Sequence, residues 1–161
     1  KMYGRYGFYF NSLLYYYLED VEFSIRAAAI GARIEKSAQL VAYHHGSLSS
    51  GNRSFFTMFH TYRHILWLII LTWPAQVILS KILSILVIQA WVIFFSTWKY
   101  GPRLYLKIVL DTGKNFSSLF RIRRKILAAY NPEFNFYSIL SNYTFRTRYG
   151  LGIRKWLGRF T

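Results

Sequence analysis

One long apolar block divides the chain, and the hydrophobic pattern differs on its two sides. From residue 64 to residue 98 the single formal charge is Lys81. The apolar stretches around that lysine, residues 65–80 and 82–98, are sixteen and seventeen residues long. A membrane-spanning helix needs about 20 apolar residues, so each stretch is slightly too short for a simple span. Pro74 lacks the N–H that a helix interior uses, and we expect it to break or kink the block.

Before the block, the pattern predicts one helix followed by two short strands. Apolar residues recur at helical spacing over residues 23–30, with Asp20 at the N-cap position and Gly31 as the stop residue. Residues 34–37 and 40–45 are expected to be strands. Residues 1–51 are therefore predicted to form a small α/β unit.

After the block, the chain becomes amphipathic and basic. Leucine, isoleucine and valine alternate with lysine and arginine up to a predicted break at residues 111–113, and a second helix is predicted over residues 115–129. From residue 131 onward we find aromatic residues and scattered basic residues without a motif. The predicted regions are an α/β unit (1–51), hydrophobic membrane-associated helices (52–98), basic amphipathic helices (99–130) and a basic aromatic tail (131–161).

The excess of basic residues and the high hydrophobic content indicate association with a membrane. Lysine and arginine outnumber acids 21 to 6, and 53% of the residues are hydrophobic, which is typical of a protein held on an anionic membrane. Residues 1–64 carry a net charge of +3 and residues 99–161 a net charge of +11. Because basic flanks stay on the cytoplasmic side, the pattern favours helices that lie in the interface or re-enter it, and a two-span hairpin stays open.

Specific side chains are expected at the lipid headgroups. Indole rings favour that boundary, which predicts this position for Trp67, Trp73, Trp91 and Trp98. Clustered cations attract anionic headgroups at about 1 kcal/mol each, and the cluster here contains Arg121, Arg123, Arg124 and Lys125. The alternative for each cation is a solvated helix face.

Acidic residues concentrate in one turn. Glu19, Asp20 and Glu22 are half of the six acids in the chain. A purely structural explanation is that Asp20 caps the helix, Glu22 complements the helix dipole, and Arg26 pairs with Glu22 four residues back.

A family resemblance favours chemistry instead. Residues 10–26, with an aromatic run followed by Glu-Asp-Val-Glu and Arg26, resemble the acceptor-side motif of inverting, rhamnosyltransferase-like family 2 glycosyltransferases. The family's His-x-Gly-x-x-Ser element follows as His44, Gly46 and Ser49. Asn11 departs from the family's usual Asp. The resemblance implies the C-terminal part of a GT-A-like nucleotide-diphospho-sugar transferase domain, followed by membrane-associated helices.

The resemblance also implies a reaction. It predicts transfer of a sugar from a nucleotide-diphosphate donor to an acceptor hydroxyl, with Asp20 as general base and Glu19 beside it. A divalent metal, Mg²⁺ or Mn²⁺, would stabilise the leaving diphosphate with His44 nearby. The expected acceptor is a lipid-linked saccharide or another envelope glycan precursor. Acceptor or donor contacts are expected from Arg26, Glu22, His45 and Ser49.

The donor-binding features of the family are missing from these residues. The only aspartates are Asp20 and Asp111, so there is no Asp-x-Asp pair, and we expect the chain to be part of a longer or split enzyme and inactive alone. Two alternatives stay open: a noncatalytic membrane scaffold and, less favoured, a nucleic-acid-binding protein. His60 and His64 have zinc-compatible spacing but no third ligand, so we expect them to be interfacial.

Overall fold

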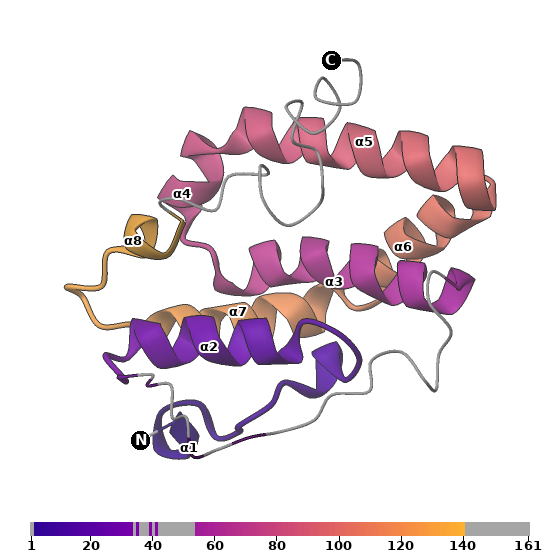
Figure 1. Ribbon diagram of the computed structural model, residues 1–161. Coiled ribbons are helices and arrows are strands. Elements are labelled where there is room, and N and C mark those ends of the chain that lie inside the picture. The colour runs from indigo at the N-terminus through magenta and orange to yellow at the C-terminus, as the bar shows by residue number, and fades with distance from the viewer. Residues whose placement is uncertain (1, 34, 36–38, 40, 42–53, 141–161) are drawn as a thin grey trace.

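The computed structural model describes residues 2–33, 35, 39, 41 and 54–140. In this part of the chain every regular element is a helix (Figure 1). The elements are α1 (Met2–Tyr6), the 3-10 helix η1 (Ser12–Leu14), α2 (Glu19–Ala29), α3 (Phe55–Thr72), α4 (Ala75–Ser80), α5 (Ile82–Tyr100), α6 (Arg103–Lys114), α7 (Phe116–Ala128) and α8 (Phe136–Leu140).

The α/β, GT-A-like expectation is therefore wrong for the described chain, which is all-α. The strands expected over 34–37 and 40–45 lie almost entirely outside the described residues. The apolar face of α2 finds its partners on other helices: Ala27 belongs to a buried cluster that includes Trp67 and Leu71 of α3 and Leu119 of α7. Burial against helices thus takes the place of burial against a sheet.

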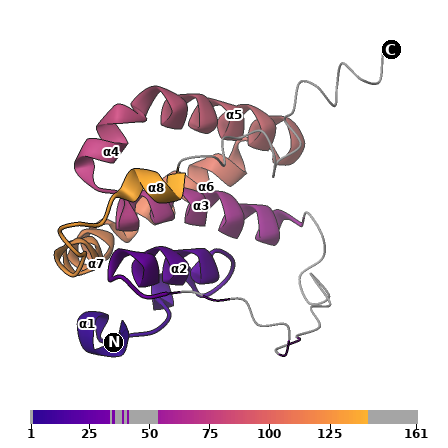
Figure 2. The ribbon, with the colours of Figure 1, turned by 60° about the vertical axis from the view of Figure 1, so that its left-hand side comes forward.

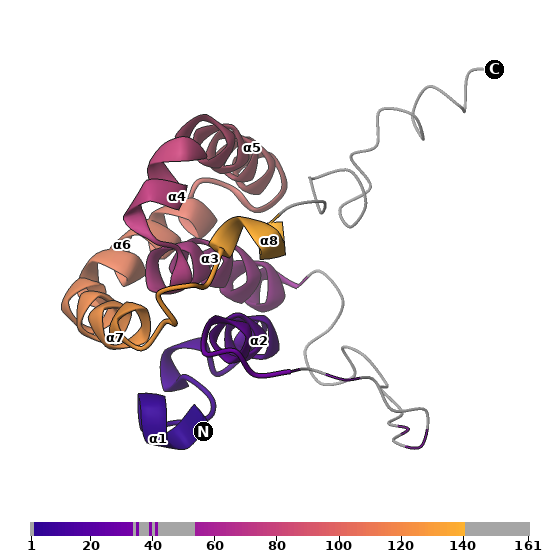
Figure 3. The same cartoon turned by 90° about the vertical axis from the view of Figure 1, so that its left-hand side faces the viewer.

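Helix α3 is central to the fold. It packs against α2, α6 and α7, whereas α5 packs on α6. In Figures 2 and 3, α3 lies between α2 on one side and α5 on the other. The α2 layer carries the acidic turn, and the α5 layer is the most apolar part of the chain.

The two ends of α2 are formed differently. At the C-terminal end, the Gly31 N–H donates to the Ala28 carbonyl and the Ala32 N–H to the Ala27 carbonyl, both at 2.9 Å. Gly31 has φ +70°, which glycine adopts without steric cost. This confirms the predicted stop residue. At the N-terminal end the cap is Leu18, with no side-chain bond, so the N-cap predicted for Asp20 is wrong by two positions.

Pro74 interrupts the apolar block as predicted. Helix α3 ends at Thr72 and α4 begins at Ala75. Because proline has no N–H, the Ile70 carbonyl four residues earlier loses its helical partner. The Arg123 guanidinium of α7 donates to that carbonyl instead. A basic side chain from α7 therefore satisfies the carbonyl that the proline leaves without a donor.

The basic region keeps one of its two predicted features. The helix expected over 115–129 is confirmed as α7. The break expected at 111–113 is wrong, because α6 continues through these residues to Lys114. Asp111 forms an ion pair with Arg63, and the Thr112 hydroxyl accepts a hydrogen bond from the Trp67 indole at 2.8 Å. Contacts with α3 therefore fix this turn as helix.

Candidate functional site

The loop before α2 has an unusual backbone. Tyr17 has φ +65° and Leu18 has φ +66°, and both are non-glycine residues. A left-handed conformation costs such residues about 1–2 kcal/mol each, so surrounding contacts must hold it. The Leu18 carbonyl accepts the first helical hydrogen bond, from the Glu22 N–H at 3.0 Å. This loop thus sets the direction in which the first turn of α2 leaves.

His64 of α3 forms a hydrogen bond to this loop. Its Nδ1 lies 3.0 Å from the Tyr17 carbonyl oxygen, and its Nε2 lies 2.8 Å from Arg63 Nη2. A carbonyl only accepts and a guanidinium only donates, so the ring is neutral with its proton on Nδ1. Burial lowers the pKa of His64 to about 4, which agrees with a neutral ring.

Arg63 connects His64 to α6. Its Nη2 also lies 3.0 Å from His60 Nδ1, and its Nη1 pairs with the Asp111 carboxylate. The guanidinium lies 4.5 Å from the Trp67 ring centroid, a cation–π distance. Since both histidines accept from Arg63, the zinc spacing of His60 and His64 serves a structural network. Within the described residues no group of three metal-ligating side chains was found.

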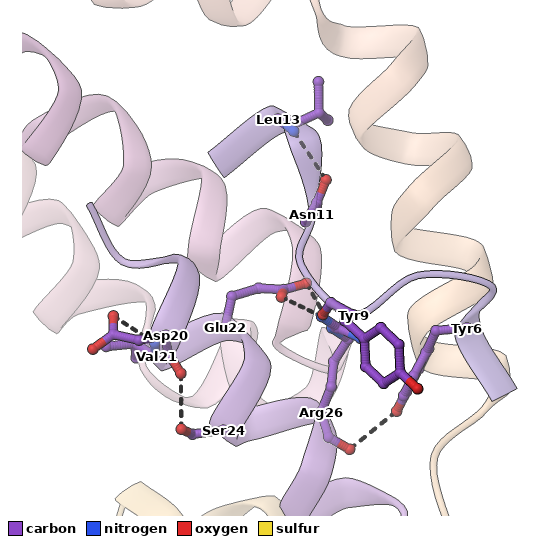
Figure 4. Close-up of polar contacts among 9 residues, drawn as sticks. All are labelled: Tyr6, Tyr9, Asn11, Leu13, Asp20, Val21, Glu22, Ser24 and Arg26. Atoms are coloured by element: carbon purple, nitrogen blue, oxygen red, sulfur yellow. Dashed lines mark hydrogen bonds and ion pairs between the residues drawn. The ribbon is translucent and has the colours of Figure 1, made fainter. Parts of the chain in front are cut away.

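Among the three acids of the turn, Glu22 is enclosed in the interior with an arginine partner. Glu22 and Arg26 are fully buried and form a two-pronged pair: Arg26 Nε donates to Glu22 Oε1 at 2.8 Å, and Nη2 lies 2.8 Å from Oε2. The guanidinium also donates to the Tyr9 carbonyl, as Figure 4 shows. Burial raises the pKa of Glu22, and the bonds from Arg26 oppose that rise.

This pair decides one open question. Glu22 and Arg26 were expected to contact acceptor or donor, but both side chains are enclosed. The i to i+4 ion pair, which was the alternative explanation, is confirmed. Phe8 and Tyr6 cover the guanidinium at 4.5 and 4.8 Å from their ring centroids. The pair therefore fastens α2 to the N-terminal segment.

Asp20 lies on the opposite, exposed face of the same helix. Two residues along a helix correspond to a rotation of about 200°, so Asp20 points away when Glu22 points inward. Figure 4 shows Asp20 directed away from the buried pair. Its Oδ1 accepts from the Val21 N–H at 2.8 Å, and its backbone carbonyl accepts from the Ser24 hydroxyl at 2.8 Å. This carboxylate is open to an approaching molecule.

Glu19 combines partial exposure with an unsatisfied atom. Its Oε2 is buried and has no hydrogen-bond partner. A buried carboxylate oxygen without a partner is costly. At this helix start the exposed Asp20 therefore offers accessible oxygen acceptors, whereas one Glu19 oxygen is enclosed.

Aromatic rings of the strained loop pack against rings at the start of α3. The Tyr16 ring centroid is 5.2 Å from that of Phe56, and the Phe56 centroid is 4.3 Å from that of His60. Tyr15 is 64% exposed. Rings from the loop and from the start of α3 therefore form one aromatic group.

Some predicted site residues cannot be placed, and others were missed. His44, His45 and Ser49 lie outside the described residues, so their roles stay predictions. Sequence reasoning missed Arg63 as the hub. A signal was present, because Arg63, His60 and His64 place three basic side chains on a helix that has no other charged residue. Its partner Asp111 is 48 positions away, and no spacing rule reaches that far.

Of the four tryptophans predicted to lie at lipid headgroups, two are buried or half-buried and two are exposed. Trp67 is only 2% exposed, so its expected place at the lipid headgroups is wrong. Trp73 is half-buried and packs on Phe136 at a centroid distance of 5.9 Å. Trp91 and Trp98 on α5 are exposed and remain suited to lipid.

The predicted basic cluster also divides. Arg123 is half-buried and bonds the Ile70 carbonyl, so its expected lipid contact is wrong. Burial lowers the pKa of Arg123. Arg121, Arg124 and Lys125 are exposed. They keep the predicted availability to anionic groups.

One described helix, α5, is long and apolar enough to cross a membrane. This feature supports membrane association and leaves the side of the membrane open. Comparison with protein-family models, curated proteins and solved structures found no match. The candidate function therefore follows from the acidic turn, the apolar helix and the sequence motif.

Proposed function

We propose that this chain contributes the acceptor side of an inverting glycosyl transfer at a membrane, with Asp20 as the general base. The observation that carries the proposal is the division of the acidic turn. Glu22 is neutralised inside by Arg26, while Asp20 is exposed on a helix start that His64 and Arg26 both hold in place. Such a carboxylate is free to take a proton.

The proton balance assigns a role to the exposed acid of the turn. The acceptor hydroxyl transfers its proton to the Asp20 carboxylate as its oxygen bonds to the anomeric carbon of the donor sugar. The bond from that carbon to the nucleotide diphosphate breaks, and the diphosphate leaves with the electron pair. Glu19, half-buried in the same first turn of α2, adds a second negative charge beside the base.

The divalent metal stays a separate prediction. When bound, Mg²⁺ or Mn²⁺ supplies charge stabilisation to a leaving diphosphate. The single ligand expected from this chain is His44, which lies outside the described residues. The roles assigned to Asp20 and Glu19 do not depend on the metal.

The membrane supplies the acceptor. The apolar helix α5 supports membrane association, and the basic flanks favour the cytoplasmic side. A nucleotide-diphosphate sugar reaches that side from solution. A lipid-linked saccharide or envelope glycan precursor, held in the same membrane, is the natural acceptor.

The test is Asp20→Asn in the natural protein, assayed in its own membranes with a panel of radiolabelled uridine, thymidine and guanosine diphosphate sugars. Loss of the base should lower transfer into the lipid or glycan fraction by about 10²–10⁴-fold. Glu133→Gln, a neutralised exposed carboxylate elsewhere, should leave transfer unchanged. If Asp20→Asn retains wild-type transfer while the protein is folded, Asp20 is not the base and a noncatalytic scaffold becomes the better explanation.

A further inference from the structure

Helix α5 exposes far more apolar surface than a helix of a water-soluble fold. Only 17% of its most apolar window is buried, along a narrow line that includes Ile85, Val92 and Ser96. Leu83 is 76% exposed and Trp98 78% exposed, near the two ends of the helix. Exposed apolar surface of this extent marks a partner or a membrane.

Exposed apolar side chains also occur on the neighbouring helices α4 and α6. Leu79 of α4 is 71% exposed, and Leu106 and Leu110 of α6 are 57% and 63% exposed. An open depression of about 510 Å³ on α5 has an almost wholly apolar lining, which includes Ile93 and Phe94. We call these exposed side chains of α4, α5 and α6 the apolar face.

Both ends of α5 are fastened to the same helical body. At the N-terminal end, the Ser80 hydroxyl is 2.9 Å from the Tyr137 hydroxyl of α8. At the C-terminal end, Tyr100 packs edge-on against Phe55 at the start of α3, with centroids 6.3 Å apart. Immediately beyond, Leu104 of α6 is buried in a cluster with α3. Figure 1 shows α6 folding back from the end of α5 toward α3.

These fastenings are incompatible with a simple span. A helix of 19 residues is about 28 Å long, close to the thickness of a bilayer core. If α5 crossed that core, its two ends would lie on opposite sides. The body that joins both ends, including Arg63 and Asp111, would then have to lie within the hydrocarbon, where charges are costly.

We infer that the apolar face inserts into one leaflet of an anionic bilayer with α5 parallel to the membrane plane. This inference concerns how the chain binds lipid and holds independently of the sugar-transfer proposal. An interfacial helix of this type buries its apolar side about 5–10 Å into the boundary between headgroups and acyl chains. The helical body, with the acidic turn, then stays on a single side.

Charge complementarity identifies the occupant as lipid. No acid occurs between Glu35 and Asp111 in the sequence, so the apolar face contains no negative charge. Exposed cations accompany it, namely Lys81, Lys99, Arg103 and Lys107. A second copy of this basic chain would bring like charges together, whereas an anionic leaflet satisfies both the apolar and the basic groups.

Side-specific labelling tests the orientation. This chain contains no cysteine, so single cysteines can replace Lys81, Lys99 and, as a marker for the body, Glu133. The natural protein, without other reactive cysteines, is labelled with a membrane-impermeant thiol reagent in sealed vesicles of either orientation. In-plane insertion predicts that all three positions react from the same side. Reaction of positions 81 and 99 from opposite sides would show a span and overturn the inference.

Vesicle flotation tests whether lipid covers the apolar face. Leu83→Glu should weaken binding to vesicles of phosphatidylcholine and phosphatidylglycerol at least tenfold, because a charge enters the apolar face. Ser12→Glu makes the same charge change on exposed η1 and should bind like wild type. Lys99→Gln should weaken binding about fivefold on these vesicles and have little effect on pure phosphatidylcholine. Equal binding by Leu83→Glu and wild type, or a soluble dimer that ignores vesicles, would refute lipid as the occupant.

Discussion

His64 Nδ1 lies 3.0 Å from the carbonyl oxygen of Tyr17, and this bond joins the central helix to the strained start of α2. The left-handed residues Tyr17 and Leu18 would relax without a contact that holds them. Arg63 and Asp111 continue the connection to the basic helix α6. The start of α2 and helix α6 are therefore parts of one hydrogen-bonded framework.

The first prediction concerns this bond. His64→Leu removes the donor to the Tyr17 carbonyl and leaves Arg63 with one acceptor fewer. We expect a loss of roughly 1–3 kcal/mol in the free energy of unfolding. Hydrogen exchange of the Glu22 amide, which bonds to Leu18, should accelerate.

Thr61→Leu, on the same helix at a half-buried position, is the comparison variant and should leave that amide protected. Unchanged exchange of the Glu22 amide in His64→Leu would contradict the role given to His64.

The second prediction concerns pH. Burial lowers the pKa of both His60 and His64 to about 4, from an ordinary value of 6.5. Between pH 6.5 and 4 the unfolded chain binds more protons than the folded chain, so stability falls as the pH falls through this window. The loss should be on the order of 2–3 kcal/mol for each histidine. Denaturant unfolding at a series of pH values measures it.

A variant with both histidines replaced by leucine serves as the reference. It retains Glu22 and every other titrating group, so the difference between the two pH profiles isolates the imidazoles. Parallel profiles for wild type and the double variant would show that these rings are not buried in neutral form.

The third prediction concerns the buried pair. Glu22→Leu leaves the Arg26 guanidinium enclosed without its carboxylate, and Arg26→Met leaves the carboxylate alone. Each single change should cost about 3–5 kcal/mol of stability. The double variant should cost much less than the sum, because it removes both buried charges.

Chemical denaturation of the four proteins completes the cycle. Strict additivity of the two single losses would mean that Glu22 and Arg26 do not interact as described. An apolar pair at these positions should leave Asp20 in its exposed place.

The fourth prediction concerns the proline break. Arg123→Leu leaves the Ile70 carbonyl without its donor and should cost roughly 1–3 kcal/mol. Arg124→Leu changes an exposed neighbour and should stay within about 0.5 kcal/mol of wild type. Thermal unfolding compares the two. Equal melting temperatures would show that the Ile70 carbonyl needs no partner from α7.

Local rules predicted part of the fold correctly. Gly31 ends α2 because a left-handed residue closes the helix, and Pro74 ends the apolar stretch because it lacks an N–H. Both effects depend on neighbours within five residues. The expected break at 111–113 failed for the opposite reason: Asp111 and Thr112 are held as helix by α3, roughly fifty positions earlier in the chain.

In the candidate site, too, local sequence rules did not predict which side chains are enclosed by distant parts of the chain. Spacing alone offered the pairing of Glu22 with Arg26, and helical rotation then places Asp20 on the other face. The family resemblance assigned all these residues to substrate instead, because a motif does not distinguish a folding role from a chemical one. Trp67 and Arg123 were similarly assigned to lipid by residue type, whereas their tertiary partners bury them.

The closed Glu22–Arg26 pair also constrains how this segment can vary over evolutionary time. An exchange at one of these two positions is tolerated only with a matching exchange at the other, so the two should covary in any set of natural variants. Asp20 contributes no partner to that pair, so its identity should not change when the pair is exchanged. Covariation among natural variants would therefore distinguish Glu22, which stabilises the helix, from Asp20, which faces outward.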